Sequence, residues 1–225
     1  MRNQAIIICS SISTLLPFLA SVMVFKLSMR PFKGLEILLA FFTVGVIAEI
    51  ALHILGSLGT QSAWVFHVFT LIEYFLVTSA LGCWQNKSTK SKLMRVSIPI
   101  YVLFYLLVKF IGLENFEAGL FNIITRPIAL LLLSIFAFLT LQDLWRHTPS
   151  NLTDDYRFWM LLAMVFYYSA SLVLFAFMFT RRQPVLIALF KIHAVVNIIH
   201  NLLFTIGVFK VRAAQKVALQ PSSPS

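Results

Sequence analysis

The sequence predicts an all-α membrane protein: a single bundle of seven transmembrane helices, with the N-terminus outside and the C-terminus in the cytoplasm. Hydrophobic residues make up 60% of the 225 residues. Charged residues make up only 12%, which is roughly half of the share in soluble domains. The apolar residues also gather in stretches of about 20 residues or more, and a helix of that length crosses a ~30 Å hydrocarbon core.

Seven such stretches follow one another along the chain, with expected bounds of 5–25, 35–57, 63–84, 94–113, 118–142, 156–180 and 184–209. The first stands where a signal peptide would, but its apolar run is longer than a signal core. Three basic residues follow it, Lys26, Arg30 and Lys33, so we expect a retained helix. The spans form one domain over residues 1–210, and residues 211–225, which end in a Pro- and Ser-rich run, are expected to be a disordered cytoplasmic tail.

Local signals refine the later spans. The fourth span is the weakest, because it is short and contains Pro99 and Lys109. In the fifth span Pro127 follows Arg126 directly, and its missing N–H predicts a bend in that helix. Thr153 precedes the sixth span and is a suitable N-cap residue for it.

The distribution of Lys and Arg decides the orientation. Of these 18 residues, twelve lie in the odd-numbered loops and the tail, three lie in the N-terminus and the even-numbered loops, and three lie within spans. Positive charge accumulates on the cytoplasmic side, so the N-terminus is outside and the number of spans is odd. We expect a multi-pass protein of the cell membrane, surrounded by lipid. The net charge of +10 belongs to the loops and does not indicate a nucleic acid partner.

The seventh span is long and apolar, yet it contains five polar residues: Lys191, His193, Asn197, His200 and Asn201. On a helix the last four fall within about one third of the circumference, whereas Lys191 lies on another face. Polar groups are costly in hydrocarbon, so this stripe should face other helices or a cavity.

Ionisable residues from four spans share one depth. Counting 1.5 Å per residue from the outer boundary places seven of them about 6 to 15 Å deep, namely Glu49, His53, His67, Glu73, Arg126, Lys191 and His193. Isolated charges there cost about 2.5–3.5 kcal/mol each, which favours pairing of the two carboxylates with Arg126, and with Lys191 as a further candidate. We predict a ligand-binding site made of Glu49, His53, His67, Glu73, Asn122, Arg126, His193 and Asn197.

These residues also have structural interpretations, which the sequence leaves open. Glu49, His53 and Arg126 can form a network that fixes helix register. Asn197 and Asn201 can hydrogen-bond between helices. In addition, Lys191 can extend to the outer surface, and His200 can be a packing residue.

The favoured function is a binding or sensing module: a receptor, sensor or carrier for a small molecule that enters from outside. The polar cluster lies under short outer loops, and histidines with an ordinary pKa of ~6.5 can respond to pH. We assign it neither catalytic residues nor a cofactor. The sequence shows no effector domain, so a signal would pass to a separate protein on the cytoplasmic side.

A second hypothesis is a zinc-dependent intramembrane hydrolase. His53, His67 and His193 are ligand types that suit zinc, which needs three protein groups and an open position for water. In outline the chain resembles the seven-helix ceramidase and adiponectin-receptor-like hydrolases. Those enzymes have His-x-x-x-His in the last helix and a metal toward the inner side, whereas this sequence has His193-x-x-x-Asn197 and an outer cluster.

A third hypothesis is a retinal-binding protein. Seven helices, an outer N-terminus and a lysine in the last helix resemble the microbial rhodopsins. The resemblance implies a Schiff base at Lys191 with Glu73 as its counter-ion. The sequence departs from that family, because the Arg–Asp pattern of the third helix is missing and Ile187 replaces the aspartate expected four residues before the lysine.

A further resemblance concerns the third and seventh spans, which contain FHVFTLIEYFLV and KIHAVVNIIHNLL. These 25 residues resemble stretches of small seven-helix inner-membrane proteins of bacteria. The resemblance implies the architecture and the bacterial inner membrane as compartment, and it implies no activity.

Overall fold

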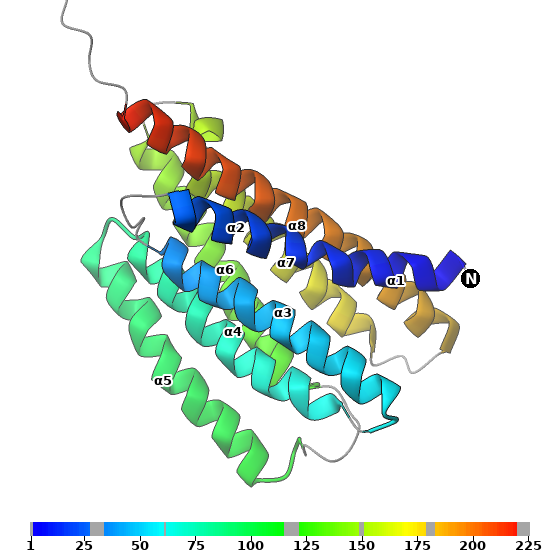
Figure 1. The fold of residues 1–225 in the computed structure, drawn as a ribbon. Helices are drawn as coiled ribbons and strands as arrows, with labels where there is room; N and C mark the ends of the chain where they lie inside the picture. The colour runs from blue at the N-terminus through cyan, green and yellow to red at the C-terminus, as the bar shows by residue number, and fades with distance from the viewer. Residues whose placement is uncertain are drawn as a thin grey trace, which may run out of the picture.

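The computed structural model describes residues 2–27, 34–60, 62–114, 122–148, 151–178 and 183–219. In this part of the chain all regular structure is helical, without β-strands (Figure 1). A short 3₁₀ helix, η1 (Leu152–Asp154), accompanies the α-helices, which are α1 (Arg2–Ser13), α2 (Leu15–Leu27), α3 (Leu35–Ser57), α4 (Ala63–Cys83), α5 (Ser88–Phe110), α6 (Thr125–His147), α7 (Tyr156–Met178) and α8 (Gln183–Leu219).

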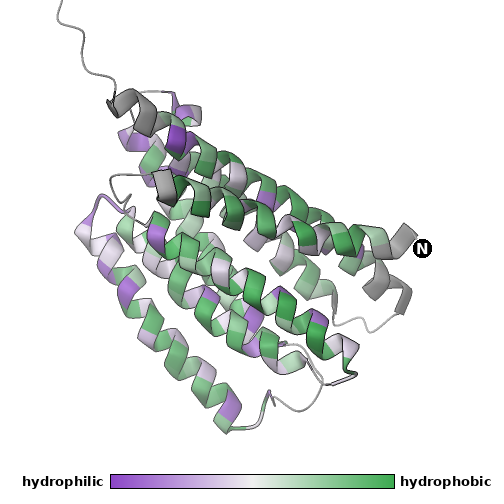
Figure 2. Ribbon diagram, in the orientation of Figure 1, coloured by the Kyte–Doolittle hydropathy of each residue, from purple (hydrophilic) through white to green (hydrophobic). Residues whose placement is uncertain are grey.

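Seven helical stretches of the described residues are long and apolar enough to cross a membrane. Figure 2 shows hydrophobic residues along most of their length. Their number and order confirm the predicted seven-span pattern. They run over Ala5–Phe25, Leu35–Ser57, Ala63–Cys83, Ser88–Phe110, Thr125–His147, Tyr156–Phe177 and Ala188–Ala213.

The first span differs from the prediction because it is broken into α1 and α2 at Thr14. Pro17 has no N–H, so the carbonyl of Ser13 loses its helical partner. Near the break, two side-chain hydroxyl groups donate to a backbone carbonyl of the preceding turn. Ser13 and Thr14 both donate to the carbonyl of Ser10, at 2.6 and 3.4 Å. The Thr14 N–H donates to the carbonyl of Ser11, three residues earlier, at 3.3 Å. The polar residues of α1 are therefore placed at an interruption of the span.

The start of α6 corrects the prediction of a proline bend. The helix begins at Thr125, so Pro127 is its third residue. An N–H in the first turn of a helix has no partner within that helix, and a proline is tolerated there. Pro127 therefore marks the beginning of α6, and Arg126 is positioned at a helix N-terminus.

The start of α5, at Ser88 instead of residue 94, the cap of α7 and the end of α8 also differ from expectation. At the start of α7 it is the Asp155 carboxylate, and not Thr153, that caps the helix, because it accepts the Arg157 N–H at 2.8 Å. At the other end of the chain α8 continues to Leu219, through much of the segment expected to be disordered. Residues 211–219 are mostly Ala, Lys, Arg, Gln and Val, and none of them ends a helix as Pro or Gly does. Residues 220–225 lie outside the described part.

The bundle is organised around α4 and α8. The first packs against α3, α5 and α6, and the second packs against α7, α1 and α2. Of the seven apolar helical stretches, α4 is the most buried, whereas α5 lies at the edge of the bundle (Figure 1). The approach of α8 to α7 is close at Gly207, where an added Cβ would lie 2.8 Å from Met160 Cγ.

Candidate functional site

A cavity of about 360 Å³ lies inside the bundle, between α1, α3, α4, α6, α7 and α8. Its wall is mainly hydrophobic and aromatic. Polar side chains from all six helices, and from the residues just before α6, also reach it. These are Ser10, Ser11, Thr14, Glu49, Thr70, Glu73, Asn122, Arg126, Tyr167, Ser171, His193, Asn197, His200 and Asn201.

An ion pair between Glu73 and Arg126 forms one part of the cavity wall. The Glu73 side chain is 1% exposed and the Arg126 side chain 12% exposed, so each charge depends on the other for compensation. The guanidinium carbon of Arg126 lies 5.9 Å from the centre of the Phe69 ring. Asn122 supports the pair indirectly, because it donates to Thr70 Oγ1 at 2.9 Å. Thr70 Oγ1 in turn lies 3.5 Å from Arg126 Nη1.

Glu49 is the second carboxylate on the wall, and it is partly exposed. It forms no hydrogen bond or ion pair with any other residue that the structure describes. The sequence placed Glu49 and Glu73 together against Arg126. The structure brings all three to one cavity, but it joins only Glu73 and Arg126 directly.

Two histidines and a tyrosine form another part of the wall. Tyr167 stacks on His200 with ring centres 4.3 Å apart and an interplanar angle of 26°. His193 lies on the same tyrosine, with ring centres 5.8 Å apart. His200 is 4% exposed, and neither of its ring nitrogens has a hydrogen-bond partner among the described residues. The hydroxyl of Ser171, also on the wall, is likewise buried and has no hydrogen-bond partner among the described residues.

The asparagines of α8 connect this helix to α1. Asn197 donates to Ser10 Oγ at 3.0 Å, and Asn201 donates to Ser13 Oγ at 2.8 Å. Both asparagines line the cavity as well. Their hydrogen bonds correspond to the structural interpretation that the sequence left open, and they hold α1 in place as one wall of the cavity.

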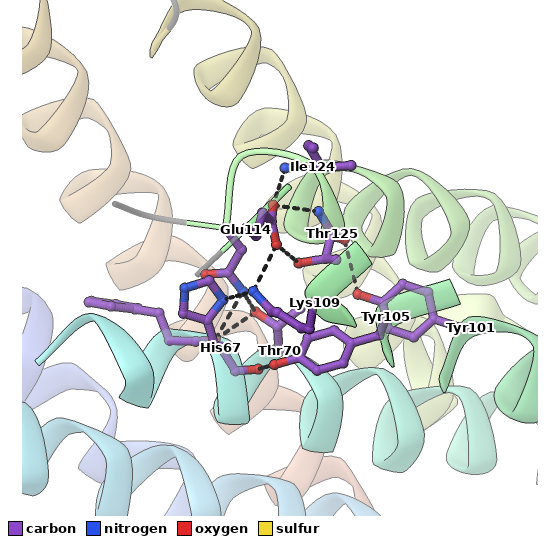
Figure 3. Close-up of polar contacts among 10 residues, drawn as sticks. His67, Thr70, Tyr101, Tyr105, Lys109, Glu114, Ile124 and Thr125 are labelled. Atoms are coloured by element: carbon purple, nitrogen blue, oxygen red, sulfur yellow. Dashed lines mark hydrogen bonds and ion pairs between the residues drawn. The ribbon is translucent and has the colours of Figure 1, made fainter. Parts of the chain in front are cut away.

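His67 belongs to a second polar cluster, shown in Figure 3. Its Nδ1 lies 2.7 Å from Lys109 Nζ, and Lys109 Nζ lies 3.0 Å from Glu114 Oε2. An ammonium group has only donors, so Nδ1 is the acceptor of that contact when Lys109 is charged. Tyr105 donates its hydroxyl to the carbonyl of His67 at 3.1 Å. This histidine is therefore engaged in joining α4 to α5.

Glu114 joins the second cluster to the start of α6 (Figure 3). One carboxylate oxygen accepts the N–H groups of Ile124 and Thr125, and the other accepts the Thr125 hydroxyl at 2.7 Å. Burial raises the pKa of Glu114. The Ile124 N–H, the two donors of Thr125 and the Lys109 ammonium outweigh burial, and they hold that pKa below its ordinary value.

The remaining predicted residues lie elsewhere. His53 is exposed near the end of α3, and Lys191 is partly exposed on α8. Neither lines the cavity. Consequently His53, His67 and His193, the residues of the zinc hypothesis, do not share a site. In the described ranges no group of three or more His, Cys, Asp or Glu side chains is placed to hold a metal ion. Lys191 and Glu73, the pair of the retinal hypothesis, are not joined either.

His200 and Tyr167 line the cavity, but the predicted site contained neither of them. A signal for His200 was present. It stands seven residues after His193, which is two helical turns, so the two rings share a face. Tyr167 lies in a helix without an ionisable group at the predicted depth, and only the packing of α7 on α8 reveals its position.

No family model, curated protein or solved structure matches this chain. The function is therefore inferred from the geometry and chemistry of the cavity in this chain.

Proposed function

We propose that the chain is an integral membrane protein that binds a small organic molecule inside its helical bundle, as a receptor, sensor or carrier. The observation that carries the proposal is the cavity of about 360 Å³. Sites for small molecules are concave and mostly apolar, with a few convergent polar groups that fix the orientation of the ligand. The cavity wall has this composition.

Membrane insertion with the N-terminus outside is part of the proposal. Seven apolar helices support insertion, and the excess of Lys and Arg in the odd-numbered loops supports the orientation. The two segments quoted above favour a bacterial inner membrane. In this orientation the start of α6 faces the outer side, and the cavity would be reached from that half of the bilayer.

The unsatisfied polar groups of the wall favour a binding function over a purely structural network. A buried polar group without a partner costs free energy. Both His200 nitrogens and the Ser171 hydroxyl are buried in this way, and the Glu49 carboxylate has no protein partner among the described residues. A network that served only to fix helix register would satisfy its own members. A bound molecule would supply the missing partners.

Native mass spectrometry of the protein purified from membranes tests this function. Ala48 lines the cavity, so Ala48→Phe should fill part of it. Ile47, the preceding residue of α3, is 60% exposed, and Ile47→Phe is the matched control. We expect a bound organic mass on the wild-type protein and on Ile47→Phe, and its loss from Ala48→Phe. An unchanged mass on Ala48→Phe would place the ligand elsewhere, and a bare wild-type chain would contradict binding.

A further inference from the structure

The charges on the cavity wall point to the chemical class of the ligand, an inference that rests on the proposed binding function. The side chains of the wall that are charged throughout the neutral pH range are Glu49, Glu73 and Arg126, because a histidine with the ordinary pKa of ~6.5 is mainly neutral at pH 7. Glu73 and Arg126 compensate each other in an ion pair. Glu49 is left, and the wall therefore has an uncompensated carboxylate.

An uncompensated carboxylate discriminates strongly between ligand charges inside a bundle. Charges interact more strongly at the low effective dielectric of a protein interior than in water. An anionic ligand would add a second negative charge next to Glu49. A cationic ligand would form an ion pair with it, and would thereby remove the cost of an isolated charge among apolar helices.

Aromatic rings favour the same class. Six phenylalanines and one tyrosine line the cavity, and the face of an aromatic ring attracts an ammonium group. The guanidinium of Arg126 already lies over one of these rings, that of Phe69. Aromatic rings of the wall also present apolar surface, against which the apolar body of a ligand can pack.

A second, independent observation also indicates a ligand at this wall. His200 lines the cavity, is 4% exposed and has no hydrogen-bond partner among the described residues at either ring nitrogen. A neutral imidazole offers one donor and one acceptor. An ammonium group or a second polar group on the ligand can satisfy the acceptor.

We propose that the cavity binds an organic monocation, a protonated amine with an apolar body, whose ammonium group pairs with the Glu49 carboxylate. Aromatic rings from α3, α4 and α7 enclose the apolar body. The ion pair of Glu73 and Arg126 remains intact and forms the neutral part of the wall.

Three probes of similar size and different charge test the proposal: 2-phenylethylammonium, 3-phenylpropionate and 3-phenyl-1-propanol. Their dissociation constants are measured by concentration-dependent thermal stabilisation of the full chain in detergent. Glu49→Gln removes the charge and keeps the shape. Glu36→Gln is the matched control, because Glu36 is exposed in the first turn of the same helix.

For the wild-type chain and Glu36→Gln we expect the ammonium to bind at least about tenfold more tightly than the carboxylate, which corresponds to ~1.4 kcal/mol. Glu49→Gln should weaken the ammonium by about the same factor and leave the alcohol unchanged. Equal binding of the three probes, or an ammonium affinity that Glu49→Gln does not alter, would overturn the assignment.

The outcomes also separate this inference from the proposed function. If the alcohol or the carboxylate binds best, and Ala48→Phe abolishes that binding, the cavity is a binding site but its ligand is not a cation. If none of the probes binds, the cation assignment fails. In that case the binding function is decided by the mass spectrum of the protein from its own membrane.

Discussion

Removing the acceptor at Glu114 is the sharpest test of how this bundle is held together. The Glu114 side chain is 2% exposed, and that of its ion-pair partner Lys109 is 9% exposed. The carboxylate accepts from this ammonium, from the hydroxyl of Thr125 and from the N–H groups of Ile124 and Thr125. In Glu114→Gln one oxygen becomes an NH₂ group, which cannot accept any of these bonds.

The expected effect of Glu114→Gln is large for a change of one atom. Whichever way the amide turns, two former donors face another donor, and the buried Lys109 loses its counter-charge. Removing one partner of a buried ion pair costs about 3–5 kcal/mol. We expect a loss of this size in the free energy of unfolding, measured from the helical circular dichroism signal during denaturation in mixed micelles. Glu36→Gln, at an exposed position of α3, is the control and should change stability by less than ~0.5 kcal/mol.

The same carboxylate predicts a pH dependence with a definite sign. The pKa of Glu114 is lower in the folded protein than its ordinary value of 4.5. The contribution of Glu114 to stability is therefore complete above about that value, and it is lost as the pH falls through the lowered pKa. Glu114→Gln should flatten the acidic limb of the stability profile. If the variant matches Glu36→Gln in stability and keeps the wild-type profile, the proposed role of Glu114 is wrong.

Three further predictions follow from packing, charge and orientation. Glu73→Gln and Arg126→Met should each destabilise by about 3–5 kcal/mol, and the double variant should lose clearly less than the sum in a double-mutant cycle; additive losses would contradict a direct ion pair. Gly207→Ala should destabilise by about 1–3 kcal/mol, because its Cβ meets Met160 Cγ at 2.8 Å. Gly56→Ala, with nothing within 4 Å, should be neutral or stabilising by up to ~1 kcal/mol; equal effects of the two in a thermal melt would refute this packing argument. A membrane-impermeant maleimide added to intact cells should leave the exposed Cys83 unlabelled until the membrane is opened, and labelling before that would reverse the proposed orientation.

The number and order of the helices could be predicted from the sequence because hydropathy in a span sums over about 20 residues and tolerates local irregularities. The break at Thr14 could not be seen in such a sum. It depends on one missing N–H at Pro17 and on hydroxyl groups that bond to the carbonyl of Ser10. For the same reason the fifth span was predicted to begin too early, at residue 118. The residues between 118 and the observed start of α6 at Thr125 are also largely apolar.

The sequence indicated in part which residues lie near one another, but not the directions in which their side chains point. Counting residues along each span gave one common layer, and Glu49, Glu73, Arg126 and His193 do line one cavity. Depth says nothing about the rotation of a helix around its axis. His67 shares the layer, but its ring joins a different cluster, because Lys109 from α5 and Glu114 from beyond the end of that helix lie next to it. Contacts of this kind depend on loop geometry, which hydropathy does not describe.

The ion pair of Glu73 with Arg126 has a consequence for the biogenesis of the protein. Its two members are 53 residues apart in the chain, and a ribosome that adds about 5–20 residues per second needs roughly 3 to 11 seconds to make that length. During this interval the carboxyl group of α4 lacks the counter-charge of Arg126. If the helices are inserted into a membrane, as we propose, Glu73 would have to enter the lipid protonated or wait in the insertion channel. We therefore expect α4 and α6 to complete their integration together, once Arg126 has been made.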